Sequence, residues 1–324
     1  MKFIFVAPIF QMEITNVLNK GKHIGHGMYI SNSQTKIQHM IHSERVLLEN
    51  GLSLMKDLQK VKTYFRCEGK YEGNPDEAEY GFNKVYNMLR QGQYFLDTLW
   101  KIKDHGSYVR EGFLFFYEGE IERVTTDSTY YYRGSLSHIN SLSNGSRETV
   151  RFDHIELEHG IKLFVEQLPQ DLSDYGSYDA TDWHFYSSVP ETRANYFLTL
   201  ARSHTVIPMK LLYYCSLLES IYSIDSSEIN HKIAERVAIT IGNSTDDKKQ
   251  IYNDIKKAYD IRSRVIHGSL IKPNVKDSLI PLTESLDIVI RRVFKSNIFK
   301  VLNYKSSEEF NNYFLERLLS ITKD

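Results

Sequence analysis

The apolar residues of this 324-residue chain change their spacing near residue 190, and this change limits the fold more than any other feature. Before it, short apolar and aromatic runs alternate with helical patterns and turn signals. From Pro190 the helical period continues almost to the end of the chain. It breaks at residues 203–208, 225–227, 242–245 and 268–274. Short connections between helices favour antiparallel neighbours, so we expect an all-α helical bundle after an α+β N-terminal domain.

Two domains also suit the length, which exceeds one average domain. We predict an α+β domain of unassigned function at residues 1–170 and a helical bundle at residues 189–324. Residues 171–188 are rich in Asp, Ser, Tyr and Gly and show no sustained period, which is typical of a linker.

The N-terminal domain has signals for both kinds of element. Residues 3–10 and 27–30 have the character of strands, and residues 112–122 with 125–132 predict a hairpin around Glu118-Gly119. Helical patterns cover residues 43–58 and 75–100. Residues 155–165 fit a strand or a short helix equally well, and Asn144-Gly145 before them is a turn signal.

Composition excludes several classes of protein. Hydrophobic residues make up 41% of the chain and charged residues 25%, as in a soluble chain that forms a core. No apolar run approaches the roughly 18 residues of a membrane helix. Residues 1–10 are apolar, but Pro8 interrupts them and no cleavage site follows, so we interpret them as a strand rather than a signal peptide. Cys67 and Cys215 lie far apart, which suits a reducing, cytoplasmic location.

The most informative segment is the helix expected from Asp246 to His267. Its apolar stripe consists of Ile251, Ile255, Tyr259, Val265 and Ile266. Arg262 falls near the middle of this stripe, where a guanidinium is costly unless it is paired or faces an anion. His267 follows five residues later, and Gly268 then stops the helix. A cation beside an imidazole can stabilise the charge of a phosphate while the imidazole moves a proton.

A structural interpretation of the same residues stays open. Arg262 has a candidate partner in Glu219, beside the apolar stripe of the second helix of the bundle, and then forms an ion pair without further function. His267 then acts as a helix C-cap, favoured by the negative end of the helix dipole.

Three segments together resemble the HEPN superfamily, and most closely its Apea-like branch of abortive-infection proteins. These segments are LLYYCSLLESI at 211–221, HKIAERVA at 231–238 and AYDIRSRVIHGS at 258–269. The defining motif of the superfamily, R-x(4–6)-H, is matched by Arg262 and His267, and Ser263 matches the polar residue that often follows the arginine. The resemblance covers roughly residues 190–300 and does not extend to the N-terminal domain.

The resemblance implies a metal-independent endoribonuclease without a cofactor, in which the 2′-hydroxyl of the RNA is the nucleophile. His267 is then the acid/base group, Arg262 holds the scissile phosphate and Ser263 orients one of them. Arg264, three residues before His267, is a rival phosphate ligand, and Lys257 and Lys272 are nearby cations for binding RNA. The family also implies a homodimer through the bundle and a role as an antiviral or toxin protein. The N-terminal domain would sense a phage-derived trigger or restrain the nuclease.

Two alternatives belong to other classes. One is a non-catalytic HEPN module for dimerisation or ligand binding, with Arg262 as a structural ion pair. The other is a metal hydrolase centred on N-terminal side chains, namely His23, His26, His39, His42 and Glu44. No cysteine accompanies these histidines, and we expect no metal site there.

Overall fold

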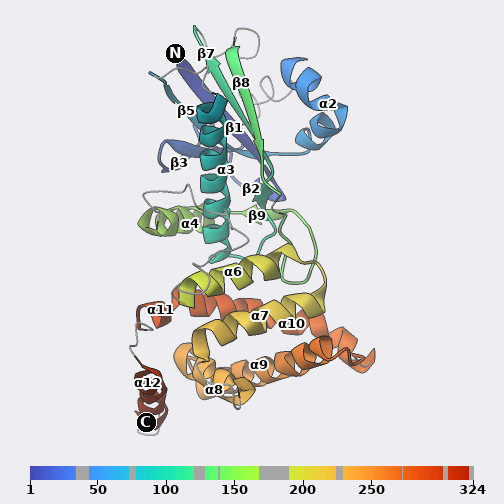
Figure 1. The fold of residues 1–324 in the computed structure, drawn as a ribbon, viewed down its shortest axis with the longest axis vertical. Coiled ribbons are helices and arrows are strands. Elements are labelled where there is room, and N and C mark those ends of the chain that lie inside the picture. The colour runs from blue at the N-terminus through green and yellow to red at the C-terminus, as the bar shows by residue number, and fades with distance from the viewer. Residues whose placement is uncertain are drawn as a thin grey trace. The chain divides into compact units, whose positions relative to one another are not determined.

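The structure is a computed structural model that describes residues 1–33, 44–72, 78–119, 128–137, 139–167, 190–223, 229–271, 273–301 and 306–320. It divides into two compact units (Figure 1). The first holds the described residues of 1–140 and 147–167, and the second holds residues 141–146 together with the described residues from 190 onward. The predicted linker at 171–188 lies outside the described residues.

The first unit is built on an antiparallel sheet, as the strand signals indicated. Its strand order is β3-β4-β5-β1-β7-β8, and the short strand β6 also pairs with β1. The strands are β1 (Lys2–Phe10), β3 (Lys22–Gly25), β4 (Met28–Ser31), β5 (Thr63–Lys70), β6 (Tyr108–Val109), β7 (Glu111–Tyr117) and β8 (Ser128–Ser135). The predicted hairpin is confirmed, because β7 and β8 pair antiparallel.

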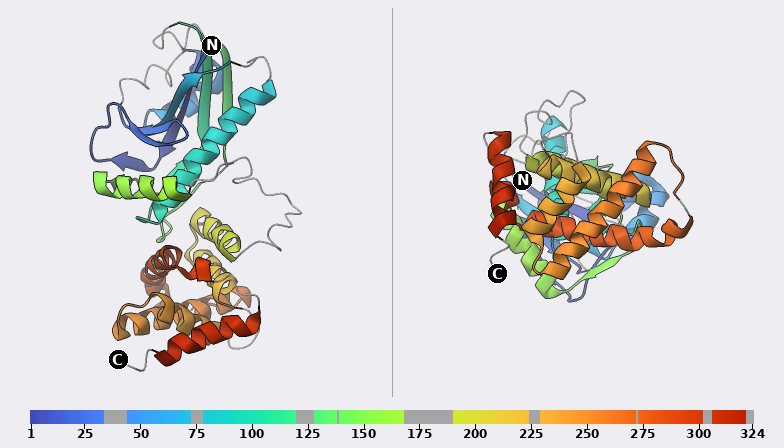
Figure 2. Two further views of the ribbon diagram at one scale, coloured as in Figure 1. Left: turned by 90° about the vertical axis from the view of Figure 1, so that its left-hand side faces the viewer. Right: turned by 90° about the horizontal axis from the view of Figure 1, so that it is seen from below.

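Helices cover both faces of this sheet because β1 alternates apolar side chains between them. Phe5 and Ala7 of β1 belong to one buried cluster, which includes Leu89 of α3 (Ala78–Trp100) and Leu157 of α4 (His154–Gln167). Ile4 and Val6 face the other cluster, which includes residues of α2 (Glu44–Leu58). Figure 2 shows α3 along the sheet with α4 beside its end. The segment at 155–165, for which the sequence allowed either a strand or a short helix, is a helix.

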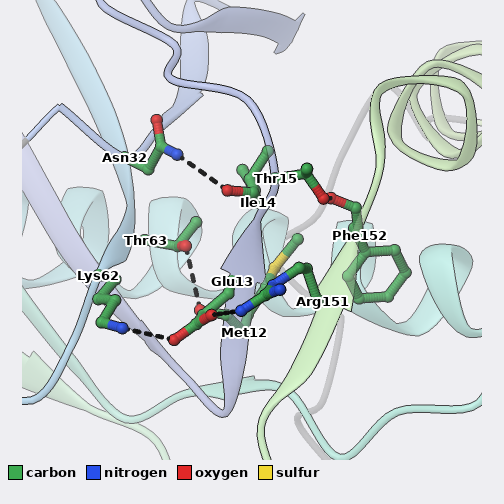
Figure 3. A network of polar contacts seen from close by, with 9 residues as sticks. All are labelled: Met12, Glu13, Ile14, Thr15, Asn32, Lys62, Thr63, Arg151 and Phe152. Atoms are coloured by element: carbon green, nitrogen blue, oxygen red, sulfur yellow. Dashed lines mark hydrogen bonds and ion pairs between the residues drawn. The ribbon is translucent and has the colours of Figure 1, made fainter.

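A smaller parallel pair joins distant parts of the first unit. It consists of β2 (Met12–Ile14) and β9 (Val150–Phe152). Glu13 lies between two cations: it accepts hydrogen bonds from Lys62 at 2.7 Å and from Arg151 at 3.0 Å (Figure 3). These two hydrogen bonds hold the pKa of Glu13 below its usual value.

Replacing Glu13 with glutamine should lower the free energy of unfolding by about 1 kcal/mol or less at pH 7, since both cations are largely exposed. The folded-state pKa of Glu13 is depressed, so its contribution is present above about pH 4 and is lost as the pH falls through the folded value. Urea denaturation at pH 7 and at pH 3 measures the difference between wild type and variant. A difference of the same size at both pH values would contradict an ionic origin.

The second unit is mostly helical. Its helices are α6 (Pro190–Ser203), α7 (Ile207–Tyr222), α8 (Ile229–Ile241), α9 (Thr245–Ile266), α10 (Pro273–Lys295), α11 (Ile298–Val301) and α12 (Ser307–Ser320). Helices α6, α7, α8 and α9 end at the breaks predicted from the sequence, whereas the breaks after α10 and α11 were not predicted. Helix α7 is buried on several sides and contacts α6, α8, α9 and α10. Figure 1 shows α7 between α6 and α9. Among the described residues, no helix is long and apolar enough to span a membrane.

One short segment differs from the predicted domain boundary. Residues 141–146, assigned from sequence to the first domain, belong to the second unit. Ser141 donates its N–H to the carbonyl of Arg202 at 2.8 Å and its hydroxyl to the carbonyl of His204 at 2.6 Å. Gly145 has a φ of +80°, and a Cβ at this position would lie 2.4 Å from the carbonyl oxygen of Thr205. The predicted turn is therefore docked against the connection between α6 and α7, through contacts that local sequence does not reveal.

Candidate active site at the end of α9

Helix α9 carries the Arg-His motif on its last turns. It begins at an N-cap, where the side chain of Ser244 accepts from the N–H of Asp247 at 3.2 Å. It ends at Ile266, and His267 occupies the C-cap with its N–H donated to the carbonyl of Ser263 at 3.0 Å. Gly268 follows in the left-handed region with a φ of +67°, which terminates the helix. The predicted helix and the capping position of His267 are confirmed.

Arg262 pairs with Glu219 of α7, the partner named in the structural interpretation. One terminal nitrogen of Arg262 lies 3.3 Å from Oε1 and 3.4 Å from Oε2 of Glu219. The side chain of Arg262 is 32% exposed and that of Glu219 is 24% exposed. Arg262 therefore lies at the edge of the core rather than inside the buried stripe that the helical period predicted. The physical reason is that the core ends before the last turn of α9, where Ile266 is exposed.

Burial dominates the electrostatics around this pair. It raises the pKa of Glu219, although Arg262 and a hydrogen bond with Tyr259 act in the opposite direction. Burial also raises the pKa values of the neighbouring Cys215 thiol and Tyr259 phenol, so both stay neutral at physiological pH. The Glu219 carboxylate therefore faces Arg262 across a weakly solvated space. The Nε atom of Arg262 is buried and has no hydrogen-bond partner among the described residues.

His267 and Ser263 lie in a different environment from Arg262. Both residues are exposed. Within the described part of the chain, the imidazole of His267 has no hydrogen-bond or ion-pair partner. An acid/base histidine is commonly oriented by a hydrogen-bond partner, and the described residues place none beside His267.

The two arginines of the motif region face different helices. Arg264 lies 200° around α9 from Arg262 and lines a groove between α9 and α10, together with Lys257. Arg262 instead faces α7 through Glu219. The structure therefore places the two predicted phosphate ligands on separate sides of one helix. Lys272, the third predicted RNA-binding cation, lies outside the described residues.

Sequence reasoning did not identify two further residues of this groove, Asp254 and Ser285. A signal for Asp254 is present in the sequence. Positions 250, 254, 257, 261 and 264 follow a helical spacing and are mostly polar, which indicates a polar stripe on one face of α9. Ser285 has no such signal, because its proximity to Asp254 depends on how α10 packs.

The N-terminal histidines do not form a described metal site. Among the residues that the structure describes, no group of three or more His, Cys, Asp or Glu side chains is placed to hold a metal ion. His23 lies in β3 and His26 in the turn between β3 and β4, and the His23 ring lies 5.1 Å from that of Tyr29. His39, His42 and the side chain of Glu44 lie outside the described residues.

No protein-family model matches the chain, and searches of curated proteins and of solved structures found no significant match.

Proposed function

We propose that the chain is a metal-independent endoribonuclease of the HEPN type, acting in the cytoplasm as an antiviral abortive-infection or toxin protein. The observation that carries this proposal is the placement of Arg262 and His267 on the last turns of α9. The guanidinium is partly exposed and the imidazole is exposed, so both are accessible to a polymer substrate. In this proposal the first unit senses a phage-derived trigger or restrains the nuclease.

The proposed reaction is an internal phosphoryl transfer. A base removes the proton of the 2′-hydroxyl, and the 2′-oxygen attacks the adjacent phosphorus while the bond to the 5′-oxygen breaks. An acid protonates the leaving 5′-oxygen, which leaves a 2′,3′-cyclic phosphate and a 5′-hydroxyl. His267 is the acid/base residue, Arg262 stabilises the charge that develops on the phosphate, and the Ser263 hydroxyl orients the phosphate.

In this proposal Glu219 is a positioning residue. It contacts one terminal nitrogen of Arg262 and thereby limits the rotamers of a long side chain. The other terminal nitrogen of Arg262 stays available for a phosphate oxygen.

A second candidate function follows from the same ion pair. If the pairing of Arg262 with Glu219 is purely structural, the second unit is a non-catalytic HEPN module for dimerisation or ligand binding. The two candidates differ in one respect that is simple to test, because only the nuclease cleaves RNA in a manner dependent on His267.

The test is incubation of the purified full chain with total RNA in the presence of EDTA, beside the His267→Ala variant. The nuclease proposal expects cleavage by wild type that survives chelation, with cyclic-phosphate ends, and none by the variant. Cleavage that EDTA abolishes would contradict a metal-independent mechanism.

We expect the protein to be a homodimer with the motif of each subunit at the interface. Ile266 and Leu270, on either side of His267, are 51% and 90% exposed, and a two-fold contact there would cover both. Such a contact would also supply a second His267, so that base and acid are separate groups. Light scattering should give about twice the chain mass of 37.9 kDa.

Replacing both Ile266 and Leu270 with aspartate should give a monomer that has lost cleavage but keeps its helical content by circular dichroism. The matched control is Val206→Asp, which changes an exposed apolar residue at the start of α7 and should leave the dimer intact. A monomeric wild type that cleaves RNA at micromolar concentration would overturn the shared site.

A further inference from the structure

The groove between α9 and α10 has a shape and a polarity that the proposed reaction does not explain. Its volume is about 480 Å³, within the range of about 300–1,000 Å³ that is usual for sites of small ligands. The face of α10 toward α9 carries small or compact residues, Ser278, Pro281 and Ser285, which leave space between the two helices.

A buried carboxylate lies in this groove. The side chain of Asp254 is 6% exposed. Its Oδ2 accepts hydrogen bonds from the Ser285 hydroxyl at 2.6 Å and from the Gln250 amide at 2.8 Å. Its Oδ1 has Lys257 Nζ at 3.9 Å, which is too long for a hydrogen bond. The two hydrogen bonds to Oδ2 therefore fix the orientation of the carboxylate. Oδ1 can still accept a hydrogen bond from an N–H group of a ligand.

The rest of the groove has apolar walls, a second carboxylate, Asp260, and a cation toward its end. Ile261 and Leu282 are buried, and Val275 and Pro281 line the groove with them. These side chains offer a surface for the face of a planar ring. Arg264 has no ion-pair partner within the described part of the chain. It lies about 15 Å beyond Asp254 along the axis of α9, and the longer side chain of Arg264 reaches further back toward the N-terminus than that of Asp254, which shortens this span.

We propose that the α9–α10 groove binds a nucleotide whose base carries an exocyclic amino group, cytosine or adenine. The amino group donates to Asp254 Oδ1, the ring lies against Pro281 and Leu282, and the phosphate meets Arg264. In cytosine an amino group stands where uracil has a carbonyl, and a carboxylate accepts from the former and repels the latter. The groove then holds the base beside the cleaved bond, because its Arg264 end approaches the Arg262–His267 motif on α9. This role rests on the proposed function.

Two pairs of ligands test the proposal without changing the protein. Isothermal titration of the full chain with CMP against UMP, and with AMP against IMP, compares bases that differ by amino and oxo groups. We expect CMP and AMP to bind at least about tenfold more tightly than UMP and IMP. Equal affinities within each pair, or no binding of CMP at millimolar concentration, would overturn the proposal.

Variants of the protein then test which residue contacts the base and which contacts the phosphate. Asp254→Asn keeps the size of the side chain but adds a donor, so it should remove or reverse the preference for CMP over UMP. Arg264→Gln should weaken CMP to the affinity of cytidine, which lacks the phosphate. Lys249→Gln removes an exposed cation of the same helix outside the groove and should leave both affinities unchanged. A preference unaffected by Asp254→Asn in a folded variant would refute the role of Asp254.

Failure of this proposal and failure of the nuclease proposal give different results. Selective binding of CMP by a protein that does not cleave RNA would support the groove and contradict the nuclease. Cleavage dependent on His267 without selectivity in nucleotide binding would support the nuclease and contradict the groove.

Discussion

Replacing His267 with alanine is expected to reduce the rate of RNA cleavage by a factor of about 10²–10⁴, the usual contribution of a general acid–base group. Arg262→Ala should reduce it by about 10²–10³, because the charge on the phosphate loses its stabilising donor in the transition state. Initial rates on a labelled RNA in EDTA measure both effects. The matched control is His231→Ala, an exposed histidine of α8 that contacts Tyr252 and lies outside the motif.

The same assay decides which arginine holds the scissile phosphate. Arg262 and Arg264 face α7 and α10 respectively, so one substitution does not disturb the contacts of the other. We expect Arg264→Ala to reduce the rate less than Arg262→Ala does. A larger loss at Arg264 would transfer the phosphate role to it, and unchanged cleavage by folded His267→Ala would reject the catalytic assignment.

Arg262→Ala should also lower the free energy of unfolding by about 1–3 kcal/mol at pH 8, the cost of leaving a desolvated carboxylate without its partner. This is less than the 3–5 kcal/mol of a fully buried pair, because both side chains keep some contact with solvent. Glu219→Gln should be close to neutral, since it removes a charge whose burial is unfavourable while a partly exposed Arg262 stays hydrated.

The stability cost of Arg262→Ala should depend on pH. Burial raises the folded-state pKa of Glu219, so stability falls as the pH rises from the usual glutamate value through the folded value. Removing Arg262 takes away a charge that lowers the pKa of Glu219. This pKa therefore rises further, and the pH range over which stability falls extends upward. Arg262→Ala should therefore cost little near pH 4, where Glu219 is protonated, and most near pH 8.

Urea denaturation of the two single variants and of the double variant Arg262→Ala/Glu219→Gln provides the measurement. The double variant should be more stable than Arg262→Ala alone at pH 8, because no unpaired carboxylate is left. A cost of Arg262→Ala that does not depend on pH would show that packing of the arginine stem, rather than the ion pair, stabilises this end of α9.

Local sequence patterns predicted several elements of both units but missed β5, which lies between β4 and β1 in the sheet. The apolar run of β1, the hairpin of β7 and β8 and the helical period after Pro190 each depend on neighbours along the chain. The C-cap at His267 follows from Gly268 alone. Residues 155–165 were ambiguous, because a short apolar segment fits either period, and packing of α4 against α3 favours the helix.

The sequence by itself determined that Arg262 and His267 end one helix and that Glu219 flanks the stripe of another. Only the tertiary structure decided where the core stops, which leaves Arg262 partly exposed at its edge. The packing of α7 and α10 on different sides of α9 gives Arg262 and Arg264 different neighbours, and it brings Ser285 to Asp254 across 31 positions of sequence. The helical period specifies the direction in which a side chain points around the axis of its helix. Which neighbour occupies that direction depends on the burial of all the helices together.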